Sequence, residues 1–240
     1  TIAKDADNSP FFLWCSYPDP HTPFGPPAPW HSMYDPKDMV TPIAWNDERS
    51  GMPEHFQLNY YTERAKIAGG PIDTTDGTLA QVSEMKALAF GMMSLVDQSV
   101  GRICEKIKDK GIVKDTIIIF LSDHGELMGD HGILFKGPYH YQGVLKVPLV
   151  FSWPGFIQQG KTSKSLVSLL DFMPTILALS GNHYPQIPFN DWVGPGSTNS
   201  NTEQDMYQDL ARLPGKSLVP VLTGKNEKVQ DSVLIENDED

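Results

Sequence analysis

The chain has 240 residues, with 19 Lys and Arg against 30 Asp and Glu, so its formal net charge is −11. This length supports one large domain or two small ones with a sizeable core. The acidic balance argues against a nucleic-acid partner, for which a basic surface supplies most of the affinity. No apolar run approaches the roughly 20 residues that span a bilayer, and Cys15 and Cys104 offer neither a disulfide framework nor a zinc site.

Both ends of the sequence look like cuts through a longer protein. The chain begins with Thr1, shows no signal-peptide pattern, and ends in an acidic run directly after the apolar residues 233–235. We therefore expect a domain that is truncated at both ends, and the sequence itself carries no signal for its cellular location.

The first predicted element is a short buried strand at residues 11–17, an apolar and aromatic run that ends at Pro18. The proline-rich stretch that follows cannot continue a sheet, because proline lacks the N–H that pairs strands. No sustained periodicity is present from there to about Gly77. We expect residues 18–77 to form a long loop region that covers a functional site, since such loops are otherwise uncommon in compact domains.

Apolar residues at spacings of three and four predict one long amphipathic helix over residues 78–110, ended by Gly111. Its methionines, such as Met92, are expected to fill the core and not to bind a metal. The run 115–121 is continuously apolar and β-branched, which is typical of a strand buried on both faces of a parallel sheet. A helix, a short turn and a buried strand together form half of a βαβ unit.

The second half of the chain predicts further strands and one helix. Residues 147–153 are expected to form a strand, and residues 165–170 one more. Residues 172–180 are expected to form a helix, with a proline in its first turn and a glycine after its end. Residues 193–205 are expected to form a polar surface loop. These elements indicate an α/β fold.

The stretch with the most chemical information begins where the strand at residues 115–121 ends. Ligands of open α/β sheets bind beyond the carboxyl ends of the strands, and Asp123 and His124 stand there, with Gly125 allowing a sharp turn. A carboxylate beside an imidazole suits a divalent cation. The alternative is that Asp123 caps the next turn and that His124 is an ordinary polar loop residue, since two ligands alone do not close a metal site.

Two more residues are candidates for a binding or catalytic role. His21 lies among prolines, whose stiff backbone suits either a positioned catalytic imidazole or an exposed histidine on a rigid loop. Lys136 offers an ammonium group for phosphate or sulfate, or it is an ordinary solvated lysine. The second Asp-His-Gly triplet, at residues 130–132, is interpreted as loop structure. Motifs of serine hydrolases, phosphate-binding loops and zinc proteases are absent from the sequence.

Taken together, these segments resemble the sulfatase family. The similar segments occur in the family's order, at residues 10–13, 20–23, 122–125, 129–132, 136–137, 147–149 and 153–155. Three more, at residues 94–103, 170–177 and 215–218, are similar to the family's long helix and to two further segments. Each motif is weak alone, but together they span most of residues 10–224.

The resemblance implies a fold, an activity and a set of site residues. The fold is an alkaline-phosphatase-like three-layer sandwich, with helices on both faces of a mostly parallel sheet, here incomplete and formed as one domain over residues 1–240. The activity is that of a sulfuric ester hydrolase of the arylsulfatase kind. In this family a divalent metal, usually calcium, is held by an early Asp pair and by a later pair that Asp123 and His124 match. His21 matches the histidine that contacts the ester oxygen and Lys136 the lysine that binds the sulfate, and either would protonate the leaving alcohol.

The family's nucleophile is missing from this chain. It is a formylglycine made from the Cys or Ser of a Cys/Ser-x-Pro/Ala-x-Arg motif, and its hydrate attacks sulfur. No Cys or Ser stands four residues before an arginine: the residues at that offset from Arg49, Arg64, Arg102 and Arg212 are Trp45, Tyr60, Gln98 and Gln208. The early Asp pair is not visible either. We expect the chain alone to be inactive and to need a missing N-terminal segment or a partner chain to complete the site.

Two other functions remain open on the sequence. A phosphonate monoester or phosphodiester hydrolase of the same superfamily is compatible with a histidine at position 124 and with manganese as its metal. A non-catalytic relative that binds sulfated ligands would account for the missing nucleophile. The expected substrate is a small-molecule or glycan sulfate ester, with neither nucleic acid nor membrane as partner, and the resemblance slightly favours a periplasmic or secreted protein.

Overall fold

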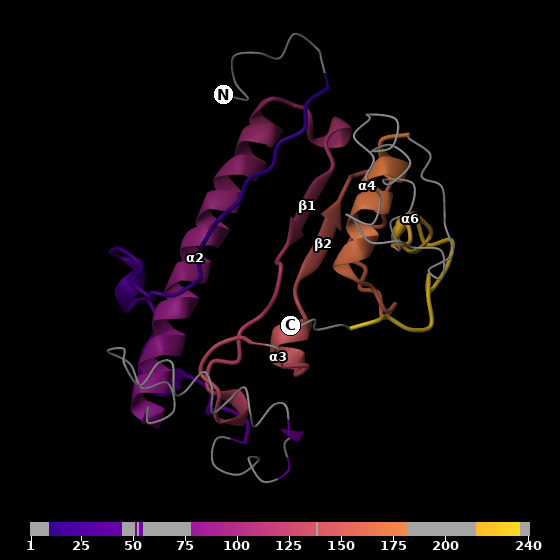
Figure 1. Cartoon of the computed structure of the whole chain (residues 1–240). Helices are drawn as coiled ribbons and strands as arrows, with labels where there is room; N and C mark the ends of the chain where they lie inside the picture. The colour runs from indigo at the N-terminus through magenta and orange to yellow at the C-terminus, as the bar shows by residue number, and fades with distance from the viewer. Residues whose placement is uncertain are drawn as a thin grey trace, which may run out of the picture. The chain divides into compact units, whose positions relative to one another are not determined.

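A computed structural model describes residues 10–44, 51, 53–54, 78–137, 139–181 and 215–235 (Figure 1). The described elements, in chain order, are η1 (Trp30–Ser32), η2 (Pro36–Asp38), α2 (Leu79–Asp109), η4 (Val113–Asp115), β1 (Ile118–Leu121), η5 (Asp130–Gly132), α3 (Gln142–Leu145), β2 (Leu149–Ser152), η6 (Leu169–Asp171), α4 (Phe172–Leu179) and α6 (Val219–Leu222). Most of residues 45–77 of the predicted loop region, and the predicted polar loop at 193–205, lie outside the described residues.

The chain divides into two compact units. The first comprises Thr1–Lys106 and Met128–Phe135, and the second comprises Ile107–Leu127 and Lys136–Asp240. Among the described residues, no helix combines the length and the apolar character that crossing a membrane requires.

Helix α2 confirms the predicted long helix, and both of its ends follow from local sequence signals. It starts in a capping box, in which the hydroxyl of Thr78 accepts the amide N–H of Gln81 at 3.3 Å and the Gln81 side chain accepts the amide N–H of Thr78 at 2.7 Å. After its last turn Gly111 adopts a φ of +70°, and the amides of Gly111 and Ile112 donate back to the final carbonyls. This pattern is a Schellman motif, which glycine forms at little steric cost.

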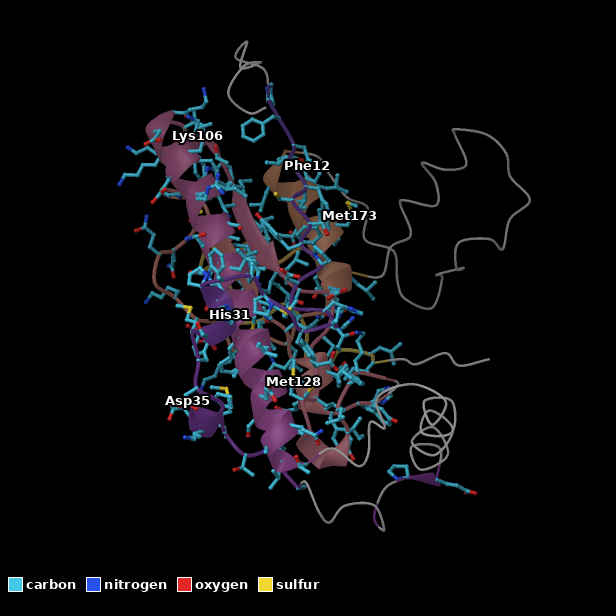
Figure 2. All side chains as sticks on the ribbon, turned by 90° about the vertical axis from the view of Figure 1, so that its left-hand side faces the viewer. Phe12, His31, Asp35, Lys106, Met128 and Met173 are labelled. Carbon is cyan, nitrogen blue, oxygen red and sulfur yellow. The ribbon has the colours of Figure 1, made fainter. Side chains whose placement is uncertain are left out.

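The first unit packs its short turns on α2. Tyr34, which follows η1, packs edge-on against Phe90 of α2 with ring centroids 5.6 Å apart, and its hydroxyl lies 2.8 Å from that of Ser94. Figure 2 shows this indigo segment, with His31 labelled, beside the helix. Met92 is buried in the core of this unit, as its place in the apolar stripe predicts.

In the second unit, β1 and β2 lie side by side (Figure 1) and pair antiparallel, with Ile118 opposite Ser152 and Leu121 opposite Leu149. Both strands lie within the runs predicted to form strands. The expectation that the first strand is buried on both faces between parallel neighbours is wrong for this pair, because a continuous apolar run does not encode the direction of its neighbour. Phe120 also remains 40% exposed.

Two predicted strands are absent from the described residues. Residues 11–17 are extended without strand pairing, and Phe12, labelled in Figure 2, is 74% exposed. High strand propensity does not by itself form a strand, because a strand needs a partner to pair with. Residues 165–170 fail for a different reason: the Ser168 hydroxyl and the Asp171 carboxylate form a capping box that starts η6 and then α4.

Helix α4 confirms the predicted helix. A buried carboxylate organises the region around it. Asp171 is 1% exposed. One of its oxygens accepts the amide N–H of Lys216 at 2.7 Å, and the other accepts the amide N–H of Ser168 at 2.8 Å and the side-chain amide of Gln230 at 3.0 Å. Three segments of the second unit are therefore joined at one fully hydrogen-bonded group, as a buried charge requires.

Candidate active site

The loop that follows β1 is fixed by close backbone packing. The amide of Gly125 donates to the carbonyl of Val144 in α3 at 2.7 Å. A Cβ on Gly125 would lie 1.9 Å from the carbonyl oxygen of Gly143, so any larger residue would push the two backbones apart. The next but one residue, Leu127, is almost completely buried. The segment between β1 and Leu127 is thus held at the carboxyl end of the strand, where the sequence places a site.

Asp123 and His124 are brought together on this loop. The Asp123 carboxylate accepts the amide N–H of His124 at 2.9 Å and the hydroxyl of Ser122 at 3.3 Å. The amide N–H, more than any other group, lowers the pKa of Asp123 below its usual 3.8. The carboxylate is therefore ionised at neutral pH, which is the state that a cation needs.

The imidazole of His124 has a defined orientation. Its Nδ1 lies 2.9 Å from the carbonyl oxygen of Gly125, and a carbonyl only accepts, so Nδ1 carries the proton. Nε2 is then the nitrogen left for a cation, and it lies 3.7 Å from the second carboxylate oxygen of Asp123. A backbone carbonyl that fixes the tautomer in this way is typical of metal-binding histidines.

These two residues fit a divalent cation as part of a site. Metal–ligand distances of about 2.0–2.6 Å allow two ligand atoms of one cation to lie up to about 4.5 Å apart, and Oδ2 of Asp123 and Nε2 of His124 meet that limit. Both side chains are open to solvent, at 82% and 41% exposed. No group of three or more His, Cys, Asp or Glu side chains suited to a metal occurs within the described residues. The pair is two ligands, and a complete site needs others.

Lys136 is placed in the second unit with a partner that the sequence did not suggest. Its Nζ lies 3.8 Å from Oε2 of Glu126, and the two side chains are 31% and 17% exposed. The ring of Tyr139 packs over the next residue, Gly137, so closely that a Cβ added to Gly137 would lie 2.7 Å from that ring. Lys136 is thus partly buried and lies beside a carboxylate.

His21 belongs to the first unit. Its amide donates to the carbonyl of Pro18 at 3.0 Å, which closes a turn, and its Nδ1 lies 2.7 Å from the carbonyl oxygen of Thr22. As in His124, the carbonyl fixes a proton on Nδ1 and leaves Nε2 as the other nitrogen of the ring. The side chain is exposed. Its backbone turn and its ring orientation are both defined, as the neighbouring prolines suggest.

The second Asp-His-Gly triplet is structural, as interpreted from the sequence. An oxygen of Asp130 accepts the amide N–H of Ile43 at 3.0 Å, and the amide of His131 donates to the carbonyl of Ile43 at 2.7 Å. The triplet forms η5, and His131 adopts a left-handed φ of 58°. Its hydrogen bonds join residues 128–135 to the segment around Ile43, both within the first unit, and so its role differs from that of Asp123 and His124.

Comparison with known proteins identifies the family. The sulfatase family model matches residues 1–182. The multifunctional alkaline phosphatase superfamily protein PehA of Trinickia caryophylli is 32% identical over 192 residues, which cover 78% of this chain and 37% of that protein. An arylsulfatase of Clostridium perfringens is 30% identical over 177 residues, which cover 71% of this chain and 34% of that protein.

Comparison with solved structures supports an alkaline-phosphatase-like fold. The phosphonate monoester hydrolase of Agrobacterium radiobacter superimposes with a TM-score of 0.60 at 29% identity, over 85% of this chain and 36% of that enzyme. The chain thus spans little more than a third of the length of these proteins, and its α/β fold is part of an alkaline-phosphatase-like domain. Members of these families use a divalent metal ion. Because the family model covers most of the sequence and an oriented Asp-His pair stands at the end of β1, this chain belongs to the sulfatase family.

Proposed function

We propose that this chain supplies part of the active site of an enzyme that hydrolyses sulfate esters. The observation that carries the proposal is the pair of Asp123 and His124, in which a carboxylate oxygen and Nε2 lie 3.7 Å apart at the carboxyl end of β1. Membership of the sulfatase family and similarity to an arylsulfatase support the same reaction.

Asp123 and His124 would hold the divalent metal, which we propose to be calcium, with the remaining ligands supplied by residues outside this pair. When bound, such a metal neutralises the negative charge that develops on the oxygens of the sulfate group. The carbonyl of Gly125 keeps the imidazole of His124 in the tautomer that can bind a cation, and the amide of His124 keeps Asp123 ionised. Both effects come from hydrogen bonds made by the protein backbone.

Lys136 would bind an oxygen of the sulfate group. Its ammonium carries three N–H donors and one positive charge, and both favour a tetrahedral anion. We propose His21 as the group that contacts the ester oxygen, where an imidazole with a second proton on Nε2 can protonate the leaving alcohol. The substrate would be a small-molecule or glycan sulfate ester.

A second candidate reaction is the hydrolysis of phosphonate monoesters. It is favoured by the superposition on the Agrobacterium radiobacter enzyme, and the histidine at position 124 is compatible with it. Sulfate and phosphonate monoesters are both tetrahedral anions, so the same lysine and the same metal ligands serve either substrate.

Turnover by the complete protein tests both candidates. The specificity constant kcat/KM for 4-nitrophenyl sulfate is compared with that for 4-nitrophenyl phenylphosphonate, in the wild type, in Lys136→Met and in Lys164→Met, an exposed lysine of the same unit. We expect the sulfate ester to be preferred, Lys136→Met to lose at least about 100-fold in kcat/KM, and Lys164→Met to retain it. Preference for the phosphonate would support the second candidate, and turnover of neither ester would contradict both.

A further inference from the structure

Glu126 lies beside the candidate sulfate-binding lysine without belonging to the metal-binding pair. Its Oε2 is 3.8 Å from Nζ of Lys136, ten residues further along the chain. The carboxylate side chain is the more buried of the two, at 17% exposed against 31%. A carboxylate kept partly out of water next to a lysine restricts where the ammonium rests, because moving the ammonium away would weaken the attraction between the two opposite charges.

The backbone that carries Glu126 is fixed on both sides. Before it, the Gly125 amide donates to the carbonyl of Val144 at 2.7 Å, and Gly125 has no space for a Cβ. After it, Leu127 is buried at 1% exposure. A side chain between two anchored residues has a defined starting point, so the position of its carboxylate varies little.

The backbone that carries Lys136 is held by the residues that follow it. Gly137 is covered by the ring of Tyr139, which is buried, and the amide of Tyr139 donates to the carbonyl of Gly137 at 2.7 Å. The lysine stem itself has four rotatable bonds, and a free lysine side chain loses considerable conformational entropy when its end is fixed. The nearby carboxylate supplies the restraint that the stem lacks.

The separation of the pair also matters. At 3.8 Å, Nζ and Oε2 are further apart than hydrogen-bonding atoms, which lie within about 3.2 Å. Glu126 therefore attracts the ammonium by charge and does not occupy one of its three N–H donors. Those donors remain able to bind the oxygens of an anionic group.

We propose that Glu126 is a positioning residue, whose carboxylate holds the ammonium of Lys136 where the anionic group of the substrate binds. This inference rests on the proposed function, because it takes Lys136 as the group that binds the sulfate. It adds a residue that lies outside the proposed metal-binding pair and acts on the substrate through the lysine.

A double-mutant cycle in the complete protein tests this role. The variants are Glu126→Gln, Glu126→Asp, Lys136→Met and the double variant of Glu126→Gln with Lys136→Met. We expect Glu126→Gln to lower kcat/KM for 4-nitrophenyl sulfate by about tenfold, to weaken inhibition by inorganic sulfate by a similar factor, and to leave the metal content unchanged. Glu126→Asp should restore part of both losses, because it keeps the charge.

The cycle separates positioning from a general structural effect. If Glu126 acts through Lys136, adding Glu126→Gln to the Lys136→Met variant lowers kcat/KM by no more than about a further twofold. An equal loss in both backgrounds, a loss of metal, or no loss in Glu126→Gln would overturn the positioning role. Full activity in Lys136→Met would instead overturn the proposed function itself. Glu227→Gln, an exposed glutamate of the same unit, is the matched control and should behave as the wild type.

Discussion

The Nδ1–H of His124 donates to the carbonyl oxygen of Gly125 at 2.9 Å, and this single bond decides which nitrogen faces Asp123. With a proton fixed on Nδ1, Nε2 is the nitrogen that lies 3.7 Å from the Asp123 carboxylate. The backbone of one glycine thus sets the chemistry of the neighbouring ring, in the way that carbonyls behind metal-binding histidines do.

The tautomer of His124 can be observed directly. In the complete protein freed of divalent metal with a chelator, we expect long-range proton–nitrogen NMR correlations to show a protonated Nδ1 and an unprotonated Nε2 at a pH where the ring is neutral. The bond to Gly125 is the reason. A ring that carries its proton on Nε2 would contradict the orientation described for this site.

Gly125→Ala should disturb the loop that carries Asp123 and His124, the two proposed metal ligands. Its Cβ would lie 1.9 Å from the carbonyl oxygen of Gly143, which is backbone and cannot rotate away. We expect this variant to lose about 3 kcal/mol of unfolding free energy in urea titrations. Gly101→Ala is the control, because this exposed glycine of α2 has open space around it and should gain about 0.5–1 kcal/mol. Equal effects of the two substitutions would argue against the packing at Gly125.

Asp171→Asn should weaken the second unit although it preserves the size of the side chain. Both oxygens of Asp171 accept N–H groups, from Lys216 on one and from Ser168 and Gln230 on the other. The new NH₂ group would face a donor in either orientation, so we expect a loss of about 3 kcal/mol in unfolding free energy. The exposed Asp231→Asn should leave the unfolding midpoint unchanged. A midpoint of Asp171→Asn equal to that of the wild type would show that the network does not hold these segments together.

Lys86 gives the first unit a pH dependence in the alkaline range. Burial is the main cause that lowers the pKa of Lys86 below its usual 10.5, while its Nζ donates to the carbonyl of Val40 at 3.0 Å. Between the lowered pKa and 10.5 the unfolded chain binds more protons than the folded one, so stability rises with pH in that window. We therefore expect the unfolding free energy of the wild type to rise relative to Lys86→Gln as the pH approaches 10.5. A constant difference between the two proteins would contradict the effect of burial.

The parts of the fold that the sequence predicts are those with local signals. The helix α2 needs only its apolar period, the capping box at Thr78 and the glycine after its end. The run at residues 11–17 looks equally clear, yet it forms no strand among the described residues, because a strand depends on a partner elsewhere in the chain. The direction in which β1 and β2 pair is likewise set by the path of the chain between them.

The candidate site, like the fold, has some features that the sequence predicts and others that only the structure shows. Asp123 and His124 are adjacent in the sequence and follow a predicted strand, so their place at its carboxyl end is predictable. The proximity of Glu126 and Lys136 is not, since no regular spacing brings residues ten positions apart together in a loop. The sequence shows only that a glutamate follows the Asp-His-Gly triplet. The structure is needed to show which lysine lies beside this glutamate.

The metal content and the aryl sulfate turnover of Asp123→Ala, measured on the complete protein, test this account most directly. Asp123 supplies the carboxylate of the oriented pair, so the variant should lose bound divalent metal and at least about 100-fold of its kcat/KM for 4-nitrophenyl sulfate. Asp231→Ala, which removes an exposed carboxylate of the same unit, should retain both. An Asp123→Ala protein that keeps its metal and its turnover would contradict the assignment of this site.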